Sequence, residues 1–208
     1  FIPGDRPVGM PSRLLARPDV PVYLRHTFIY AALAVTGAYT HGVLISSVGA
    51  QIARSLIGSP SPWINSVALA LFPVALGIAG SLARKIEARR SVITGSIVSA
   101  TGMLSLCISV SEHSLVFFIS ASLISGAGYA FMTFGGLGLI AREARQSDRG
   151  SAMSMLFVFA YLFTGGLAVV LGKMATQLNL AVAVFTGALI LIFICAVLII
   201  LGLFQLRS

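Results

Sequence analysis

His41 is the only Asp, Glu, Lys, Arg or His residue that lies well inside a long apolar stretch of this 208-residue chain. Imidazole titrates near neutral pH and can relay protons, and an ionisable side chain within a membrane span is a functional candidate. His41 is therefore a candidate proton relay. The alternative is a neutral histidine at a helix contact, because Ala34, Gly37 and Ala38 share its helix face and small residues permit close packing.

Other arrangements of reactive residues are missing from the sequence. The run beginning at Ser125, S-G-A-G, departs from the G-x-S-G of intramembrane serine proteases. The chain has no H-E-x-x-H motif, no P-loop and no paired aspartates within its apolar runs. Cys107 and Cys195 fall inside apolar runs and do not have the spacing of metal ligands. The sequence therefore predicts no enzyme activity, no cofactor and no metal site.

Polar and aromatic residues recur at helical spacing in three of the apolar runs, where successive residues turn by about 100°. Such faces line either a substrate cavity or a close helix contact. For the Ser residues, close packing is the favoured interpretation. For Tyr129 and Tyr161 the cavity is favoured, because a hydroxyl on a large ring suits a partly wet surface. The candidate cavity residues are Thr36, Thr40, Ser47, Ser125, Tyr129, Thr133 and Tyr161.

The composition identifies the class of protein that must position these residues. Hydrophobic residues make up 57% of the chain and charged residues only 10%, with a formal net charge of +8. Soluble domains carry about a quarter charged residues. Nucleic-acid-binding proteins gather basic residues on one face of a soluble core, whereas here these residues lie between long apolar runs. The composition therefore predicts a membrane protein and excludes a nucleic-acid partner.

Six apolar runs are long enough to cross a bilayer as helices, which takes roughly 20 residues. None of them contains Asp, Glu, Lys or Arg, and only a helix can satisfy the backbone of each run internally. The fold class is thus an all-α integral membrane bundle of six helices at 27–208, preceded by a basic, proline-rich cytoplasmic segment at 1–26. The predicted spans are 27–49, 62–83, 91–110, 115–141, 151–172 and 180–204.

The basic residues divide unequally between the two sides of this six-span arrangement. Twelve of the 14 Lys and Arg residues fall on one side, and only Arg54 and Lys173 fall on the other. Cytoplasmic loops of membrane proteins carry the excess of Lys and Arg. We therefore expect a multi-pass protein of the cell (inner or plasma) membrane with both termini in the cytoplasm. The twelve are Arg6, Arg13, Arg17, Arg25, Arg84, Lys85, Arg89, Arg90, Arg142, Arg145, Arg149 and Arg207.

The loop between the second and third spans reads G-S-L-A-R-K-I-E-A-R-R from Gly80 to Arg90. It resembles the loop motif of the major facilitator superfamily, G-x-L-a-D-r-x-G-r-r/k. Gly80 matches the first position, and Arg89 and Arg90 supply the basic end. Arg84 stands at the acidic position, so the copy is eroded, as in the second six-helix half of that family. The run D-R-G-S-A-M-S at 148–154 is similar to the family's entry to helix eleven.

This resemblance implies that the chain is the C-terminal half, helices seven to twelve, of a transporter working by alternating access. It implies that the first, second, fourth and fifth helices line the cavity and that Gly80, Arg84, Arg89 and Arg90 form a conformational loop. The expected partners are an N-terminal six-helix half absent from this chain, a small-molecule substrate and the lipid bilayer. We expect proton-coupled drug or metabolite efflux, with any charges that select the substrate in the absent half.

Three alternatives come from other classes of protein. One is a free-standing six-helix membrane protein that dimerises as a channel or transporter. Another is a non-catalytic membrane subunit of a larger complex. The third is a membrane enzyme whose site follows none of the motifs above.

Overall fold

The computed structural model describes residues 20–47, 49–58 and 61–207, and every regular element in these ranges is helical. Six of the helical segments are long and apolar enough to cross a membrane, which confirms the predicted number of spans. The predicted cytoplasmic segment lies mostly at 1–19, outside these ranges. The elements are η1 (Val22–Leu24), α1 (Arg25–His41), η2 (Gly42–Ser47), α2 (Gly49–Gln51), η3 (Ile52–Leu56), α3 (Pro62–Ala83), α4 (Ala88–Ser111), α5 (Leu115–Glu143), α6 (Gln146–Gln177) and α7 (Leu180–Arg207).

Several helices are longer or less regular than the apolar runs predicted. α6 spans Gln146–Gln177, whereas the predicted span was 151–172, because a helix continues through charged residues that reach out of the apolar layer. The first span runs over Val22–Ser55. From Gly42 onward it contains the π-helical turns η2 and η3, which are rare and often occur at functional sites.

Local signals define where some helices begin. Ser61 precedes α3, and its hydroxyl oxygen accepts a hydrogen bond from the Ile64 backbone N–H at 3.4 Å, with Pro62 in the first turn. Asn179 precedes α7, and its Oδ1 accepts from the Val182 backbone N–H at 2.7 Å. Both residues occupy backbone donors that a helix start leaves unsatisfied.

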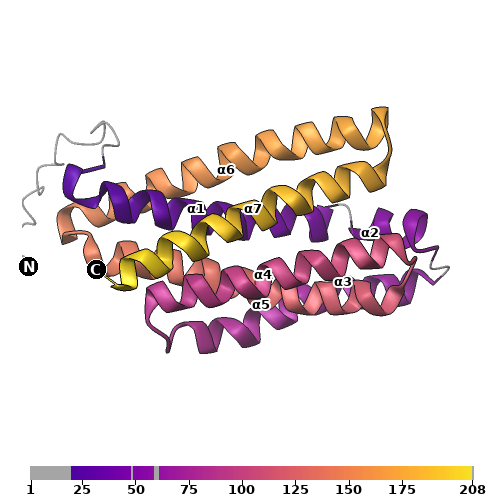
Figure 1. Cartoon of the computed structure of the whole chain (residues 1–208), viewed down its shortest axis with the longest axis horizontal. Coiled ribbons are helices and arrows are strands. Elements are labelled where there is room, and N and C mark those ends of the chain that lie inside the picture. Colours follow the sequence, from indigo (N-terminus) through magenta and orange to yellow (C-terminus); the bar gives the residue numbers. More distant parts are fainter. Residues whose placement is uncertain (1–19, 48, 59–60, 208) are drawn as a thin grey trace, which may run out of the picture.

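The helices lie roughly along one common direction, and their connections alternate between the two ends of the bundle (Figure 1). The start of α1, the α3–α4 and α5–α6 connections and the end of α7 lie at one end, which we call the basic end. The described basic residues of the larger predicted group belong to these segments, and Arg54 and Lys173 belong to the other end. The alternation of charge in the sequence thus corresponds to a physical separation in the fold.

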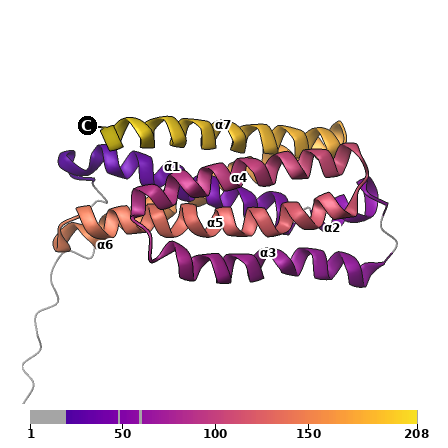
Figure 2. The same cartoon turned by 60° about the horizontal axis from the view of Figure 1, so that its bottom comes forward.

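Helix α5 is the centre of the bundle. It packs against α1, α3 and α4, and it lies between α4 and α3 in Figure 2. Glycines make this close packing possible. A Cβ on Gly135 would lie 2.8 Å from the Ala88 carbonyl oxygen of α4, and a Cβ on Gly136 would lie 3.1 Å from the Ala31 carbonyl oxygen of α1. The small residues of α5 therefore act mainly as sites of close backbone approach.

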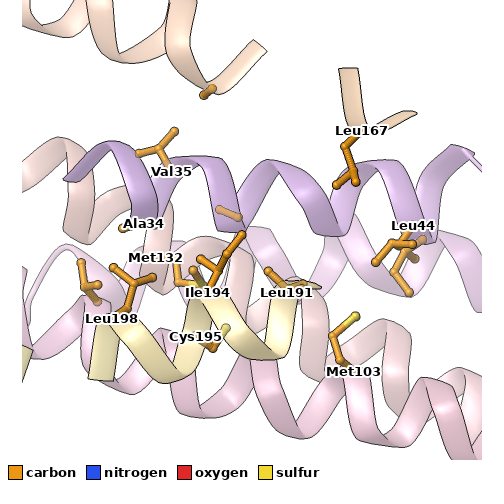
Figure 3. Packing of buried hydrophobic residues seen from close by; sticks show 14 of the residues in the cluster. Ala34, Val35, Leu44, Met103, Met132, Leu167, Leu191, Ile194, Cys195 and Leu198 are labelled. Atoms are coloured by element: carbon orange, nitrogen blue, oxygen red, sulfur yellow. The ribbon is translucent and has the colours of Figure 1, made fainter. Parts of the chain in front are cut away.

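One face of α7 completes the apolar core (Figure 3). α7 packs against α4, α1 and α6, and its buried Leu191, Ile194, Cys195 and Leu198 belong to the apolar core. The remaining surface of α7 is exposed and aliphatic or aromatic.

The buried side chains of α6 form a single row along the helix. These are Ala152, Leu156, Ala160, Thr164, Leu167 and Leu171, spaced by three or four residues. This spacing places them on one line along the helix. α6 packs through this row mainly on α1 and α7. In both views α6 meets α7 at the end opposite the basic end and diverges from it toward the basic end (Figures 1 and 2).

Candidate functional site

An aromatic cluster joins four of the six spans near the middle of their lengths. The Tyr39 ring of α1 stacks on Tyr129 of α5, with centroids 5.9 Å apart and an interplanar angle of 6°. Tyr161 of α6 lies 5.3 Å from Tyr39, and Phe157 lies 6.5 Å from it. Phe72 of α3 meets Tyr129 edge-on at 5.8 Å. These separations are typical of favourable aromatic contacts.

The cluster borders an open groove of about 430 Å³, which we call the aromatic groove. Small residues keep it empty: a Cβ added to Gly165 or Gly42 would meet no atom within 4 Å. Tyr161 is 63% exposed, so its ring lies at the mouth. The lining residues are Tyr39, Gly42, Val43, Tyr129, Tyr161, Thr164, Gly165 and Ala168.

The lining of the aromatic groove suits the binding of a small organic molecule. Its lining contains no carboxylate, amine, guanidinium or imidazole. The Tyr39 hydroxyl interacts with those of Tyr129 and Tyr161, so the groove presents ring faces together with a few hydrogen-bonding groups. Ligand pockets for small organic molecules typically combine an apolar or aromatic lining with a small number of polar groups.

The structure brings together only part of the predicted cavity. Tyr129 and Tyr161 line the groove, and Thr133 follows Tyr129 by one turn of α5. Thr40 is buried, and its hydroxyl donates to the Thr36 carbonyl oxygen at 2.9 Å. Thr36 borders a different groove, between α1, α6 and α7.

Ser125 and Ser47 complete the predicted set. Ser125 is fully buried at the contact of α5 with α4, where a Cβ on Gly102 would lie 2.6 Å from its Oγ. This position corresponds to the packing interpretation favoured for the Ser residues. The side chain of Ser47 lies outside the described part of the structure.

Three members of the cluster, Tyr39, Phe72 and Phe157, were not among the predicted site residues. Tyr39 is the residue on which the other rings converge, and Phe72 extends the cluster to α3. Tyr39 carried the same signal as Tyr129 and Tyr161, a hydroxyl-bearing ring within an apolar run. Phe72 had no such signal in the sequence, because a phenylalanine in a membrane span is equally suited to facing lipid, the core or a cavity.

His41 lies within the bundle, two residues and therefore about 200° around α1 from Tyr39. It is fully buried, and its Nδ1 lies 3.1 Å from the Gly37 carbonyl oxygen. The ring also faces the backbone of Ser99 on α4. Its Nε2 makes no hydrogen bond of normal geometry with the described residues. This histidine does not line the aromatic groove.

On the sequence-based expectation of proton-coupled transport, we predict that His41→Gln leaves transport and its response to a proton gradient nearly unchanged. A glutamine amide can donate or accept the hydrogen bond that the imidazole makes. The bond to Gly37 lies within α1, and even an interhelical hydrogen bond in a membrane contributes only about 0.6 kcal/mol on average. Gradient-driven and gradient-free transport of the variant, compared with the wild type, checks this. A selective loss of the gradient-driven component would instead identify His41 as a proton relay.

The predicted loop-motif residues lie at the basic end. Gly80 contacts the Phe134 ring, and the Arg84 guanidinium lies 4.6 Å from the centroid of that ring. Arg89 forms an ion pair with Glu143 of α5 at 3.8 Å. Glu143 was not among the predicted site residues. Arg90 pairs with Glu87 at 3.1 Å. Exposed ion pairs contribute about 0–1 kcal/mol.

A second set of contacts links the start of α1 to the α5–α6 connection. The Thr27 hydroxyl donates to the Glu143 carboxylate. The Tyr23 hydroxyl donates to Asp148 Oδ2 at 2.9 Å and accepts from the Arg145 backbone N–H at 3.1 Å. The Arg145 guanidinium lies 5.0 Å from the Tyr23 ring centroid. Four helices, α1, α4, α5 and α6, are thus connected at the basic end.

These features fit a multi-pass α-helical membrane protein with a groove suited to organic ligands. Comparison of the chain with protein-family models, with curated proteins and with solved structures found no match. Membership in the major facilitator superfamily therefore stays a prediction.

Proposed function

We propose that the chain is one six-helix half of a secondary transporter of the major facilitator type, with the aromatic groove as its wall of the substrate cavity. The observation that supports this proposal is which helices contribute the five rings of the aromatic cluster. They come from α1, α3, α5 and α6, the first, second, fourth and fifth spans. These are the spans that the family resemblance implies for the cavity. The third and sixth spans, α4 and α7, contribute no ring.

The substrate best suited to this wall is a small, largely apolar or aromatic organic molecule with few hydrogen-bonding groups. Aromatic faces offer it stacking surface, and the Tyr39, Tyr129 and Tyr161 hydroxyls supply orientation. No charged side chain lines this wall, so it offers no ion pair to a charged substrate. Together with the proposed N-terminal half, the groove would close around the substrate during alternating access.

Trans-stimulated exchange tests the proposal. Vesicles that contain the chain together with its proposed partner half are loaded with unlabelled members of a panel of small aromatic compounds. Uptake of the same labelled compound from outside is then measured. A carrier with alternating access is stimulated by substrate on the opposite side, whereas a channel formed by a dimer of this chain is not. Uptake that is unaffected by internal substrate across the panel would reject the transporter assignment.

The proposed orientation places the basic end in the cytoplasm, because twelve of the 14 Lys and Arg residues belong to that side. We expect Lys173→Cys to react with a membrane-impermeant thiol reagent in intact cells. We expect Glu87→Cys to react only after the membrane is permeabilised. Both substitutions are made in a background with Cys107 and Cys195 replaced by Ala. Labelling of Glu87→Cys in intact cells would reverse the orientation.

A further inference from the structure

A second groove lies on the opposite flank of α6 from the aromatic cluster. It has a volume of about 410 Å³ and an almost wholly apolar lining from α1, α6 and α7. Taking the buried row of α6 as the reference, Phe157 and Tyr161 lie on one flank, and Phe159 and Phe163 lie on the other. We call this second site the lipid-side groove. Residues of α1, α6 and α7 line it.

Exposed aromatic rings border the lipid-side groove. Phe159, Phe163 and Phe193 are each exposed on the surface of the bundle while lining it. The α1 side of the groove includes Ile29 and Thr36. These two residues are seven positions apart, which corresponds to a rise of about 10 Å along the helix. The shape is therefore an elongated apolar slot that reaches from the basic end toward the middle of the span.

A basic residue, Arg25, lies at the basic end of this slot. Arg25 is one turn before Ile29 and lies on the same strip of α1, about 200° from Thr27, which faces α5. Arg25 is exposed and makes no ion pair with the residues that the structure describes. The nearby carboxylates already have other donors: Glu143 accepts from Thr27, and Asp148 accepts from Tyr23 and Ser147.

We propose that the lipid-side groove binds an anionic phospholipid of the basic-end leaflet, with one acyl chain along the slot and the phosphate beside Arg25. The charge favours this occupant over a zwitterionic lipid, because basic residues near a membrane surface attract acidic headgroups by about 1 kcal/mol each. The site is independent of the proposed transport activity. It requires only that the helices cross a membrane, and it lies on the other flank of α6 from the proposed substrate.

Quenching of a single tryptophan by brominated lipids tests the proposal. Trp63 is replaced by Phe, and Phe193→Trp places the probe in the groove. The full chain is reconstituted in phosphatidylcholine nanodiscs containing either brominated phosphatidylglycerol or brominated phosphatidylcholine. We expect the acidic lipid to be preferred about fivefold at this position, which is the ratio that one such charge provides. Arg25→Gln should remove the preference, and the matched control Arg54→Gln at the other end should keep it.

A second probe position separates the groove from bulk lipid. Leu189→Trp is exposed on α7 but does not line the groove, so both brominated lipids should quench it alike. If Phe193→Trp fails to fold, Phe163→Trp reports on the opposite wall. Equal quenching at the groove position, or a preference that survives Arg25→Gln, would overturn the proposal. A groove probe that neither lipid quenches, beside a quenched Leu189→Trp, would show that a protein segment covers this surface instead.

Discussion

Replacing Gly165 with Phe should abolish transport while leaving the bundle folded. Gly165 lines the aromatic groove, and a Cβ there meets nothing within 4 Å, so the new ring enters the groove and not the protein core. Forcing a substrate against such a ring costs about 1–3 kcal/mol or more, which is about fivefold to 150-fold in affinity. Phenylalanine is also a better helix former than glycine. Substrate affinity and exchange rate are measured together with thermal stability.

Gly166→Phe is the matched control for this experiment. Its Cβ position is equally empty, but Gly166 lies about 100° further around α6 and does not line the groove. Transport by this variant should be close to that of the wild type. If both variants transport normally, substrate does not pass through the aromatic groove. If both lose transport while remaining folded, the effect reflects the surface of α6 in general, and the groove is not specifically required.

Replacing Gly135 with Leu should prevent the bundle from packing. A Cβ at this position would lie 2.8 Å from the Ala88 carbonyl oxygen and 2.9 Å from the Val92 backbone nitrogen. Both obstacles are backbone atoms of α4, so no rotamer change relieves the clash. We expect a loss of about 3 kcal/mol, the upper end of the usual range for overpacking, or more. Monodispersity on size exclusion and the midpoint of thermal unfolding check this expectation.

Gly77→Leu provides the comparison for Gly135→Leu. Gly77 lies on the exposed side of α3, and its Cβ position has no neighbour within 4 Å. The same substitution there should change stability by a few tenths of a kcal/mol, as is usual for surface sites. A Gly135→Leu protein that unfolds at the wild-type temperature would contradict the close α4–α5 contact. It would also weaken the role assigned to the α5 glycines.

The number of spans was predictable from the sequence, because run length and backbone hydrogen bonding depend only on local residues. The ends of α6 were not predictable in the same way, because a helix continues through charged residues once their side chains can reach water. Helical spacing also grouped Thr36 and Thr40 on one face of α1. Spacing alone does not say which neighbour a face will meet, and here that face meets the bundle interior and the lipid-side groove.

The aromatic groove was therefore predicted in part. The rings of Tyr129 and Tyr161 were identified because a hydroxyl on a large ring is awkward to pack and suits a partly wet surface. Their contact through Tyr39 depends on how α1, α5 and α6 pack, which no local pattern encodes. The same reason explains why the contacts of Glu143 were not predicted. Its pairing with Arg89 and Thr27 brings together residues more than 50 positions apart.

The single buried row of α6 has a mechanical consequence. A helix seated on one row of side chains can roll about that row while keeping most of its contacts, whereas lifting it away would break them all. Rolling in one sense presses Tyr161 inward and turns Phe163 outward, and rolling in the other sense does the reverse. Rotation of α6 that widens one of the two grooves would then narrow the other. A ligand in one groove would therefore change the width of the other, with Ala160 and Leu167 near the axis of rotation.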